Sequence, residues 1–410
     1  MVEALRCRAC GSADLLPILS LGRTPLANAL VEAADLATPD ATFPLDVVFC
    51  RGCTLVQLTL SVPPERLFRE YAYFSSFSDA LVGHARRLVE RLVPDRRLGA
   101  ANLVCEVASN DGYLLQHYVA AGVPVLGIEP AANIAKVARE RGIETVSEFF
   151  GRDLARALRA SGRVADVIHA NNVLAHVPDL RGVVAGFREL LAPSGVAVIE
   201  APYVRDMIDH CEFDTIYHEH LCYFSLTALD RLFRAEGLTI VDVEHLPIHG
   251  GSLRIFATPS ASSPARSGSV DAMLADERAW GVDKDATYAA FASDVETVRR
   301  DLIALVDELR REGHHVAAYG AAAKGATLLN YAGIGADRID FVADRNTYKQ
   351  GRYMPGARIP IVAPSALLDR APAYTVLLTW NFADEIFAQQ AEYRARGGKF
   401  IVPVPRVEIR

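Results

Sequence analysis

The sequence predicts an α/β protein whose central part is a doubly wound, mostly parallel sheet. Short apolar runs alternate with segments of helical periodicity from residue 103 to residue 257, which is the pattern of parallel strands joined by helices. A second alternation of the same kind begins near residue 316, after a segment rich in serine, proline and alanine at 259–269. We therefore expect 410 residues to form several domains.

The composition narrows the class of protein. Hydrophobic residues make up 51% and charged residues 23% of the chain, the balance of a globular enzyme. A net charge of −7 argues against a nucleic-acid partner, because binding phosphates needs a basic surface. The chain has no run of 18 apolar residues and no charged-then-apolar leader, so we expect a cytoplasmic protein with no membrane partner. A monomer is the working expectation, although the sequence does not fix the oligomeric state.

Residues 1–65 are expected to form a small zinc-binding domain. Four of the seven cysteines fall into two pairs with CxxC spacing, Cys7 with Cys10 and Cys50 with Cys53. So short a segment cannot bury much of a core, and four thiolates from two tight turns suit a tetrahedral, structural Zn²⁺. A redox pair and buried free thiols are the alternatives.

Residues 66–262 are expected to form the sheet domain. A helix over 64–98, carrying aromatic residues at 71–74, precedes it. The final two strands are joined by the short segment 249–252, so we expect the last strand to run antiparallel. The predicted strands are 103–107, 125–128, 167–170, 196–200, 238–244 and 253–257, and the predicted helices are 112–121, 133–141, 180–191 and 226–236.

The loop from Glu106 to Gly112 is predicted to bind a nucleotide cofactor. It ends a strand and opens a helix, and its small residues let backbone N–H groups approach a ligand. Glu129, at the end of the next strand, can accept hydrogen bonds from ribose hydroxyls. A nicotinamide dinucleotide is disfavoured because the loop lacks G-x-G-x-x-G, and core packing is the alternative role of the phenylalanines at 149 and 150. The expected cofactor contacts are Glu106, Ala108, Ser109, Asn110, Gly112, Glu129, Pro130, Glu148, Phe149 and Asn171.

Polar segments also gather where the predicted strands end. The segments 171–176, 217–220 and 249–252 all fall at the carboxyl edge of the sheet, which is where open parallel sheets bind ligands. Three histidines, a carboxylate and a tyrosine are more than a core needs, and they favour acid–base chemistry. A metal held by residues 218–220 is disfavoured, because adjacent side chains on an extended segment point apart.

Residues 263–410 are expected to form a second, Rossmann-like α/β domain. A long helix over 283–312 leads into strands at 316–319, 340–344, 374–378 and 400–402. The small-residue turn Gly320–Gly325 opens a helix and can hold a diphosphate, with charge added by Lys324, Lys349 and Arg352. The alternative is a tight turn with solvated lysines. No NAD is expected, because its fingerprint is absent.

Taken together, these motifs resemble the S-adenosylmethionine-dependent sugar C-methyltransferases of antibiotic pathways, which methylate C-3′ of dTDP-4-keto deoxysugars. The resemblance covers essentially the whole chain. It implies a zinc-binding domain, a class I methyltransferase domain and a C-terminal domain that helps to hold the nucleotide sugar. Ala108 departs from the glycine that is usual in the cofactor loop. The motifs are the two CxxC pairs and the segments 71–76, 106–112, 217–225, 249–254 and 319–325.

The resemblance also implies roles for individual residues. His220 is the base that removes the C-3′ proton of a dTDP-4-keto-2,6-dideoxysugar, with or without a 3-amino group, and Tyr217 and Glu219 orient or tune it. Tyr71 and His176 hydrogen-bond the sugar or help to carry the proton. An O- or N-methyltransferase is the rival reading, and an RNA-directed zinc protein is disfavoured by the acidic charge. The implied substrate contacts are Asn172, His249, Ser252, Lys324, Lys349 and Arg352.

Overall fold

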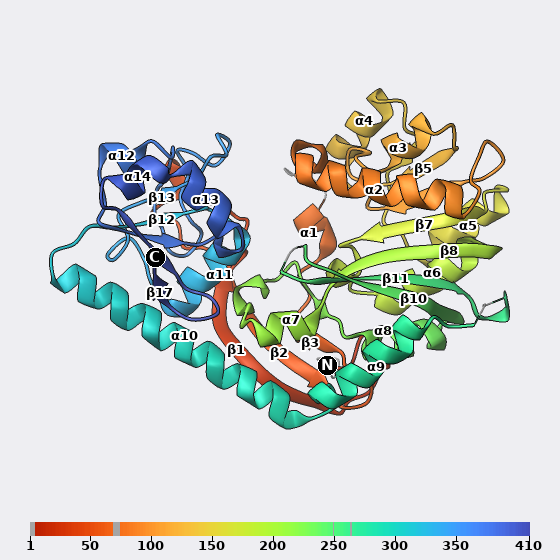
Figure 1. Cartoon of the computed structure of the whole chain (residues 1–410), viewed down its shortest axis with the longest axis horizontal. Helices are drawn as coiled ribbons and strands as arrows, with labels where there is room; N and C mark the ends of the chain where they lie inside the picture. Colours follow the sequence, from red (N-terminus) through yellow and green to blue (C-terminus); the bar gives the residue numbers. More distant parts are fainter. Residues whose placement is uncertain (1–4, 69–73, 249, 263–264) are drawn as a thin grey trace.

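The computed structural model describes residues 5–68, 74–248, 250–262 and 265–410, and these residues form three sheets. Two α/β halves face each other, and the N-terminal sheet and the long helix α10 run along one side of both (Figure 1). Within the described part of the chain, no helix combines the length and the apolar character needed to cross a bilayer.

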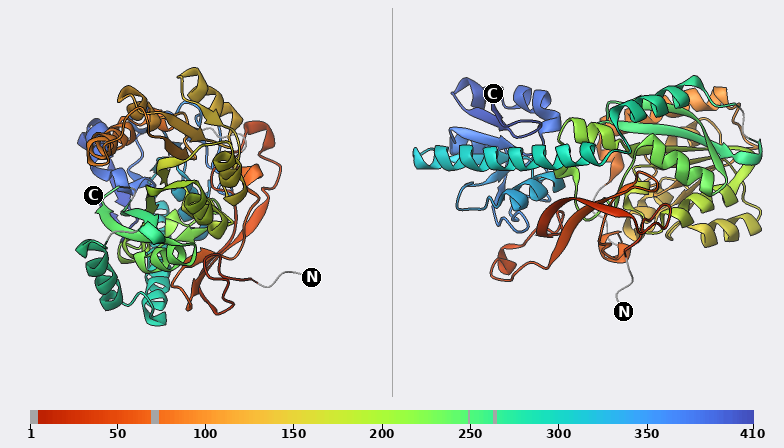
Figure 2. Two further views of the ribbon diagram at one scale, coloured as in Figure 1. Left: turned by 90° about the vertical axis from the view of Figure 1, so that its right-hand side faces the viewer. Right: turned by 90° about the horizontal axis from the view of Figure 1, so that it is seen from below.

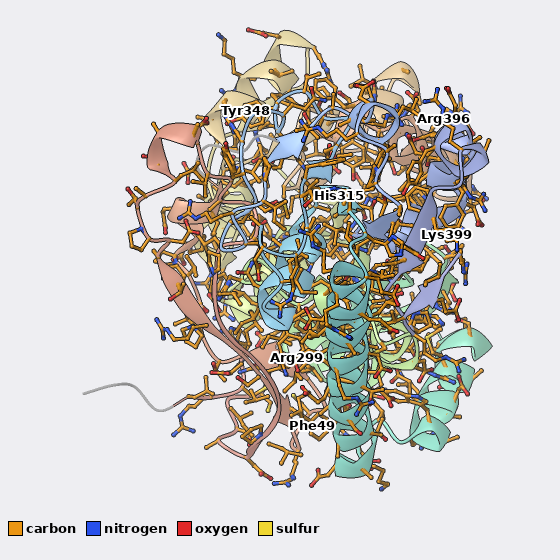
Figure 3. All side chains as sticks on the ribbon, turned by 90° about the vertical axis from the view of Figure 1, so that its left-hand side faces the viewer. Phe49, Arg299, His315, Tyr348, Arg396 and Lys399 are labelled. Atoms are coloured by element: carbon orange, nitrogen blue, oxygen red, sulfur yellow. The ribbon has the colours of Figure 1, made fainter. Side chains whose placement is uncertain are left out.

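The N-terminal sheet is antiparallel and takes its last strand from far along the chain. Its order is β1-β2-β3-β9, with β1 at Leu15–Pro25, β2 at Thr42–Cys50, β3 at Val56–Leu58 and β9 at Cys222–Tyr223. Phe49 of β2 stacks on Tyr288 of α10 with ring centroids 4.1 Å apart, and Figure 3 displays Phe49 beside this helix. The cysteine-bearing segment therefore buries its apolar face against the rest of the chain.

The central sheet confirms the predicted doubly wound fold. Its strand order is β10-β11-β8-β7-β4-β5-β6, and β11 runs antiparallel to both of its neighbours while the other pairings are parallel. The carboxyl ends of the parallel strands point toward the C-terminal half (Figure 1). The strands are β4 (Val104–Val107), β5 (Val125–Ile128), β6 (Thr145–Val146), β7 (Ala165–Asn171), β8 (Leu191–Pro202), β10 (Leu238–Leu246) and β11 (Ser252–Pro259).

Helices cover both faces of this sheet, as the alternation of strands and helices predicts. One face is covered by α2 (Asp79–Asp95), α3 (Leu115–Ala120) and α4 (Ala132–Glu140), and the other by α5 (Arg152–Ala160), α6 (Leu180–Leu190) and α8 (Leu226–Ala235). The prediction of one continuous helix over 64–98 was wrong. The segment is divided into α1 (Pro64–Phe68), a 3-10 turn at Ser75–Phe77 and α2, because Ser78 caps α2 by accepting a hydrogen bond from the N–H of Leu81.

Between β8 and α8 the chain leaves the sheet for a long excursion. This segment holds α7 (Val204–Asp209), the 3-10 turn η4 (Phe213–Thr215) and β9. The N–H of Leu221 donates to the carbonyl of Ala175 at 2.6 Å, and Leu58 donates to the carbonyl of Leu221 at 2.9 Å. The excursion is therefore fixed between the central sheet and the N-terminal sheet.

The C-terminal half begins with two helices, α9 (Gly268–Trp280) and α10 (Asp285–Arg311), and Figure 2 displays α10 extended along the molecule. The linker expected over 259–269 was too long, because α9 begins at Gly268. Glu277 of α9 is fully buried and accepts hydrogen bonds from the N–H groups of Leu226 and Thr227, which caps α8.

A six-stranded sheet follows α10, in the order β14-β13-β12-β15-β16-β17. Only β17 runs antiparallel. Its elements are β12 (Val316–Tyr319), β13 (Val342–Ala343), β14 (Ile361–Val362), β15 (Tyr374–Leu377), β16 (Lys399–Val402) and β17 (Glu408–Ile409), with helices α11 (Ala323–Ala332), α12 (Ala366–Asp369), α13 (Ala383–Gln389) and α14 (Ala391–Ala395).

Candidate functional site

The four predicted zinc ligands lie together. The sulfur atoms of Cys7, Cys10, Cys50 and Cys53 are all within 4.8 Å of one another, with Cys7 and Cys53 sulfurs at 3.4 Å. Four thiolates at this separation fit the tetrahedral sphere of Zn²⁺. Hydrogen bonding with Cys53 lowers the pKa of Cys7 to about 5, which favours a thiolate there. In the described residues, this is the one His, Cys, Asp and Glu group compact enough to hold a metal ion.

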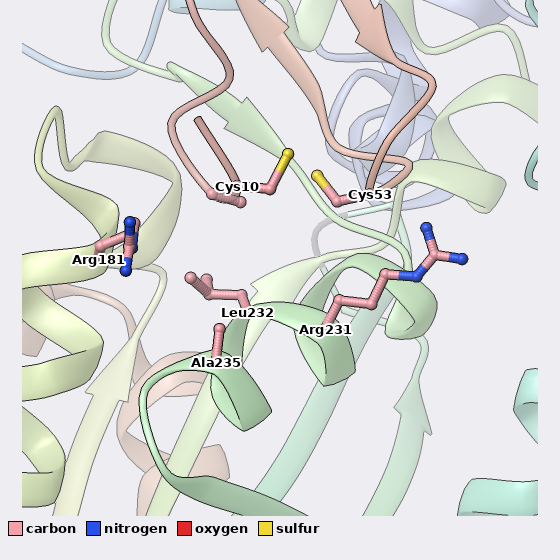
Figure 4. Close-up of a pocket in the computed structure, with 7 residues that line it drawn as sticks. Cys10, Cys53, Arg181, Arg231, Leu232 and Ala235 are labelled. Atoms are coloured by element: carbon pink, nitrogen blue, oxygen red, sulfur yellow. The ribbon is translucent and has the colours of Figure 1, made fainter. Parts of the chain in front are cut away.

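A small cavity opens beside the cysteines, between the zinc segment and helix α8 (Figure 4). Its volume is about 170 Å³, and Cys10, Cys53, Arg181 and Arg231 are among the residues that line it. Ligand pockets for molecules of nucleotide size are larger, at roughly 300–1,000 Å³. None of the predicted cofactor contacts lines this cavity.

The predicted cofactor loop has an unusual backbone. Ala108, Asn110 and Gly112 have φ values of 52°, 50° and 83°, so left-handed residues alternate through the turn between β4 and α3. This conformation costs about 1 kcal/mol or more at a residue with a Cβ atom, such as Ala108. Gly127 on β5 lies against the loop, and a Cβ atom there would be 2.6 Å from Oγ of Ser109. Strain and close packing together hold the loop in one shape.

Buried carboxyl groups line the loop. Glu129 is buried, and its two carboxylate oxygens accept hydrogen bonds from the backbone N–H groups of Asn110 and Ala131 at 2.9 and 2.8 Å. Glu106 is buried too, and its Oε2 has no hydrogen-bond partner among the described residues, as is also true of Oγ of Ser109. Burial raises the pKa of Glu106 well above its usual value, and nearby Glu129 and Asp111 raise it further. Unsatisfied buried polar atoms are expected where a polar ligand belongs.

The remaining predicted cofactor contacts lie at the same edge. Pro130 follows Glu129 and is half-buried, and Asn171 ends β7 with its Oδ1 buried and unpaired within the described ranges. Glu148 and Phe149 follow β6 and are exposed, with Phe149 41% exposed. Phe150 behaves differently, since it is buried and stacks on Phe187 of α6. The core-packing role therefore applies to Phe150, while the ring of Phe149 stays accessible.

The segment after η4 carries the predicted acid–base residues. The hydroxyl of Tyr217 lies 3.0 Å from Nε2 of His220, and Nδ1 of His220 lies 2.9 Å from the carbonyl oxygen of Thr215. A carbonyl oxygen can only accept, so Nδ1 carries the hydrogen and Nε2 keeps its lone pair in the neutral ring. Both side chains are partly exposed. The geometry therefore places the hydrogen on Nδ1 and turns Nε2 toward the hydroxyl of Tyr217.

His176 and Glu219 flank this pair. The rings of His176 and His220 meet edge to face with centroids 4.9 Å apart. Burial lowers the pKa of His176 to about 4, and a hydrogen bond with the backbone of Glu219 opposes this shift. His176 is therefore neutral near pH 7. The carboxylate of Glu219 is buried and accepts a hydrogen bond from Nδ2 of Asn28 at 2.7 Å, and burial raises its pKa. Asn28, in the N-terminal segment, carried no signal in the sequence.

The neighbouring histidine points elsewhere. Nε2 of His218 lies 3.3 Å from the carbonyl oxygen of Pro44, and its ring meets Phe43 edge to face. His218 and His220 therefore contact different parts of the molecule, which agrees with the expectation that residues 218–220 do not bind a metal together. The backbone carbonyl of Thr215 fixes the tautomer of His220. The sequence analysis missed this residue because every residue has a backbone carbonyl, so the residue type does not reveal the role.

Several predicted substrate contacts can be placed and two cannot. Tyr71 and His249 lie outside the described residues. Asn172 has a φ of 56°, and its N–H donates to the carbonyl of Glu200 on β8. Ser252 starts β11 and is buried, with its hydroxyl donating to the carbonyl of Ile248 at 3.1 Å. Both therefore lie at the carboxyl edge of the central sheet.

The basic residues predicted in the C-terminal half each have a partner within the chain. Nζ of Lys324 donates to Oδ1 of Asn381 at 2.9 Å, and Nζ of Lys349 donates to the carbonyl of Ala321 at 2.8 Å. Arg352 pairs with Glu32 at 2.8 Å. Binding a diphosphate would require these side chains to share or exchange partners.

Comparison with protein families gives three matches that together span most of the chain. A zinc binding domain matches residues 7–68, a methyltransferase domain matches residues 78–243, and a C-methyltransferase C-terminal domain matches residues 247–405. The C-methyltransferase NovU of Streptomyces niveus is 40% identical over 403 residues, which are 98% of this chain and 96% of that protein.

Solved structures resemble parts of the chain more distantly. Magnesium protoporphyrin IX methyltransferase of Synechocystis PCC 6803, determined with bound SAM, is 16% identical with a TM-score of 0.35 and covers 48% of this chain and 89% of its own. The CcbJ methyltransferase of Streptomyces caelestis is 14% identical with a TM-score of 0.34 and covers 43% and 89%. At these scores the likeness carries no functional argument.

Proposed function

Because this chain belongs to the family of C-methyltransferases, we propose that it transfers the methyl group of S-adenosylmethionine to C-3′ of a dTDP-linked 4-keto-2,6-dideoxysugar. Within this class, a sugar that carries an amino group at C-3′ is the first substrate to test. The observation that carries the proposal is the orientation of His220, whose Nδ1 donates to the carbonyl of Thr215 and whose Nε2 lies 3.0 Å from the hydroxyl of Tyr217, a position from which it can accept a proton.

The loop between β4 and α3 fits the methyl donor. Glu129 would accept hydrogen bonds from the ribose hydroxyls, and Glu106 and Ser109 have buried polar atoms without partners in the described chain that suit the polar groups of the methionine part. We assign Glu148 and Phe149, which follow β6, to the flanks of the adenine, and Asn110, Gly112, Pro130 and Asn171 to further contacts at this edge. When bound, S-adenosylmethionine supplies an electrophilic methyl group on a positively charged sulfur.

Methylation at carbon needs a base that heteroatom methylation does not. The hydrogen on the carbon next to a ketone leaves slowly in water, so a positioned base must remove it. Nε2 of His220 would take this proton and leave the electron pair of the C–H bond on C-3′, conjugated with the ketone. S-adenosylmethionine, when bound, would supply the methyl group to this carbon, and the S–CH3 bond would break with its electron pair remaining on the sulfur of the departing neutral thioether. The hydroxyl of Tyr217 at 3.0 Å orients the imidazole, and neutral His176 can donate to or accept from the sugar. Glu219 supports the segment through Asn28.

Substrate contacts follow from the same edge. Asn172 and Ser252 lie at the carboxyl ends of the strands, and the resemblance assigns Tyr71 and His249 to the sugar as well. Lys349 and Arg352 would reach the nucleotide from the C-terminal half. We assign Lys324 a diphosphate contact only if it exchanges its bond to Asn381.

The proposal is tested with dTDP-4-keto sugars, with and without a 3-amino group, and isotopically labelled S-adenosylmethionine. Mass spectrometry should detect one added methyl group, and fragmentation should locate it on C-3′. In D₂O without the methyl donor, the wild type should exchange the C-3′ hydrogen for deuterium. His220→Asn should lower both rates by roughly 10²–10⁴-fold, the usual contribution of a general base.

His218→Asn is the matched control, because this histidine is the near neighbour of His220 but faces Pro44. It should keep both activities within about 3-fold wherever melting curves confirm folding. Methyl transfer to oxygen or nitrogen would establish the rival O- or N-methyltransferase. C-3′ exchange that does not depend on His220 would refute the proposed base.

A further inference from the structure

The turn that orients His220 is held by the C-terminal half of the chain. Asp214 lies in η4, directly before Thr215, and its side chain is fully buried. Its Oδ2 accepts a hydrogen bond from the indole Nε1 of Trp380 at 2.7 Å. Trp380 begins the 3-10 turn that follows β15, so a residue of the C-terminal sheet region bonds to the turn next to the proposed base.

Further contacts strengthen this connection. Nζ of Lys324 lies 4.3 Å from the centre of the Trp380 ring, within the range of a cation–π interaction. Phe213, also in η4, meets Tyr331 of α11 edge to face with centroids 5.6 Å apart. Burial raises the pKa of Asp214 to about 6, and the Lys324 ammonium opposes that rise. Side chains of two C-terminal elements, α11 and the 3-10 turn that follows β15, thus converge on one short turn.

The turn passes this constraint to His220 through its backbone. The N–H of Ile216 and that of Thr215 are bonded back to Phe213 and Glu212, and the hydroxyl of Thr215 donates to the carbonyl of Glu212 at 2.7 Å. The orientation of the Thr215 carbonyl is therefore fixed within η4. That carbonyl accepts the Nδ1 hydrogen of His220 at 2.9 Å, so a shift of the turn would move or loosen the imidazole.

We propose that Trp380 and Asp214 are positioning residues for the C-methylation reaction, through which the C-terminal half fixes the orientation of the His220 base. Lys324 supports them by holding the Trp380 ring. This inference rests on the proposed function, since it assumes that His220 removes the proton. It gives the C-terminal domain a part in the chemical step in addition to any contact with the nucleotide.

The chain provides a matched control. It contains two tryptophans, and each donates its indole N–H to an aspartate of the excursion between β8 and α8. Trp280 of α9 donates to Asp209 at 2.7 Å, but Asp209 ends α7 and lies outside the turn that holds Thr215. The substitutions Trp280→Phe and Trp380→Phe remove the same bond from the same excursion at two different places.

The experiment measures kcat and KM for both substrates, C-3′ deuterium exchange, and S-adenosylmethionine affinity by calorimetry. Trp380→Phe should lower kcat and the exchange rate together by roughly 10- to 100-fold, because small displacements of a catalytic group cost that much. Its KM values and its affinity for the methyl donor should stay within about 3-fold of wild type. Trp280→Phe should leave every one of these quantities within about 2-fold.

A second pair of variants protects the test against a general packing defect at Trp380. Asp214→Asn keeps an oxygen that can accept the indole N–H, whereas Asp214→Leu has a similar volume and no acceptor. Asn should retain most of kcat, and Leu should reproduce the loss seen in Trp380→Phe. Melting curves for all four variants identify any that fail to fold.

The possible failures are distinguishable. If wild type neither methylates nor exchanges C-3′, the proposed function fails and the positioning role falls with it. If wild type is active but Trp380→Phe and Trp280→Phe lose kcat equally, or Trp380→Phe changes only KM, the positioning role is overturned and the proposed function stands. Equal losses in Asp214→Asn and Asp214→Leu would also contradict the positioning role, because the loss of kcat would then not depend on a hydrogen-bond acceptor at position 214.

Discussion

Two regions of the molecule share one local design, the turn after β4 and the turn after β12. In both, a strand runs into a small-residue turn and a helix, and an acidic residue follows the next strand. In both, that residue accepts a hydrogen bond from a backbone N–H of the turn, from Asn110 to Glu129 at 2.9 Å and from Ala321 to Asp344 at 2.6 Å.

The two turns differ in what happens to their other polar groups. Beside the first turn, Oε2 of Glu106 and Oγ of Ser109 are buried without a partner among the residues described. At the second turn, Nζ of Lys349 donates to the carbonyl of Ala321, and Gln350 donates to the carbonyl of Asp344. Two buried polar atoms beside the first turn are thus without a partner in the described residues, whereas the Lys349 and Gln350 side chains beside the second turn bond within the chain.

The backbone repeats this difference. The first turn places a left-handed φ at Ala108, which a side chain resists, whereas the second places it at Gly320, which tolerates it. Unsatisfied groups and strain cost stability and are retained where a ligand repays them. The comparison teaches that the same strand–turn–helix unit leaves buried polar atoms unpaired in one half, where we propose the cofactor site, and bonds its neighbouring side chains within the chain in the other.

The largest expected effect separates the two acidic residues. Glu129→Gln should weaken S-adenosylmethionine binding by roughly 30-fold, about 2 kcal/mol, because charge-assisted hydrogen bonds to ribose are lost. Asp344→Asn, the matched substitution in the second half, should leave the affinity unchanged within about 2-fold. Calorimetry measures both. An equal loss of affinity in the two variants would break the comparison.

A smaller effect is expected on the free energy of unfolding. A carboxylate-to-amide substitution should raise it at Glu106, beside the first turn, and lower it at Asp344, beside the second. Burial raises the pKa of Glu106 above its usual 4.5, so the ligand-free wild type loses stability as the pH rises through the folded-state pKa. Glu106→Gln cannot ionise and should be more stable than wild type by about 1–3 kcal/mol near pH 8, with little gain near pH 4. It should also bind the methyl donor less well.

Asp344→Asn should instead be less stable than wild type, by roughly 1 kcal/mol, because the Asp344 carboxylate accepts N–H bonds from Ala321 and Asn346. Denaturant unfolding at the two pH values measures both variants. If Glu106→Gln were destabilised at high pH, the carboxylate would already be satisfied within the chain, and the first turn would no longer differ from the second.

The smallest effect probes what the second half contributes to the substrate. Lys349→Met should raise the KM for the nucleotide sugar by about 3- to 10-fold with kcat unchanged, since a partly exposed charge adds roughly 1 kcal/mol to phosphate binding. Steady-state kinetics with the sugar varied measures it. Lys399→Met, at an exposed position of β16, is the control. A Lys349→Met variant with lower stability and normal KM would make the second turn a scaffold alone.

Much of this architecture could be predicted because it is encoded over short stretches. Strand β5 was predicted at its observed bounds, Val125–Ile128, since its apolar run is bounded by a proline and an acidic turn. The zinc cysteines followed from CxxC spacing. The turn between β4 and α3, where we propose that the cofactor binds, followed from the predicted strand and helix on either side of it.

Other parts could not be predicted, because their residues make sense only against distant partners. Strand β9 has two residues and exists because Cys222 and Tyr223 pair with β3 of the N-terminal sheet. Helix α9 is weakly amphipathic and was not predicted, although its Glu277 caps α8. Neither element has a periodic pattern long enough to identify it.

The sequence by itself determined which chemical groups are present and at which edge of the sheet they gather, because strand order and turn chemistry are local. The family resemblance assigned His220 as the base, without its tautomer. Only the tertiary structure decided that Thr215 holds Nδ1, that Asp214 lies beside Thr215, and that Trp380 holds Asp214. These contacts join residues far apart in the chain, and hydrogen-bond geometry between them is set by packing, which no single segment of the sequence contains.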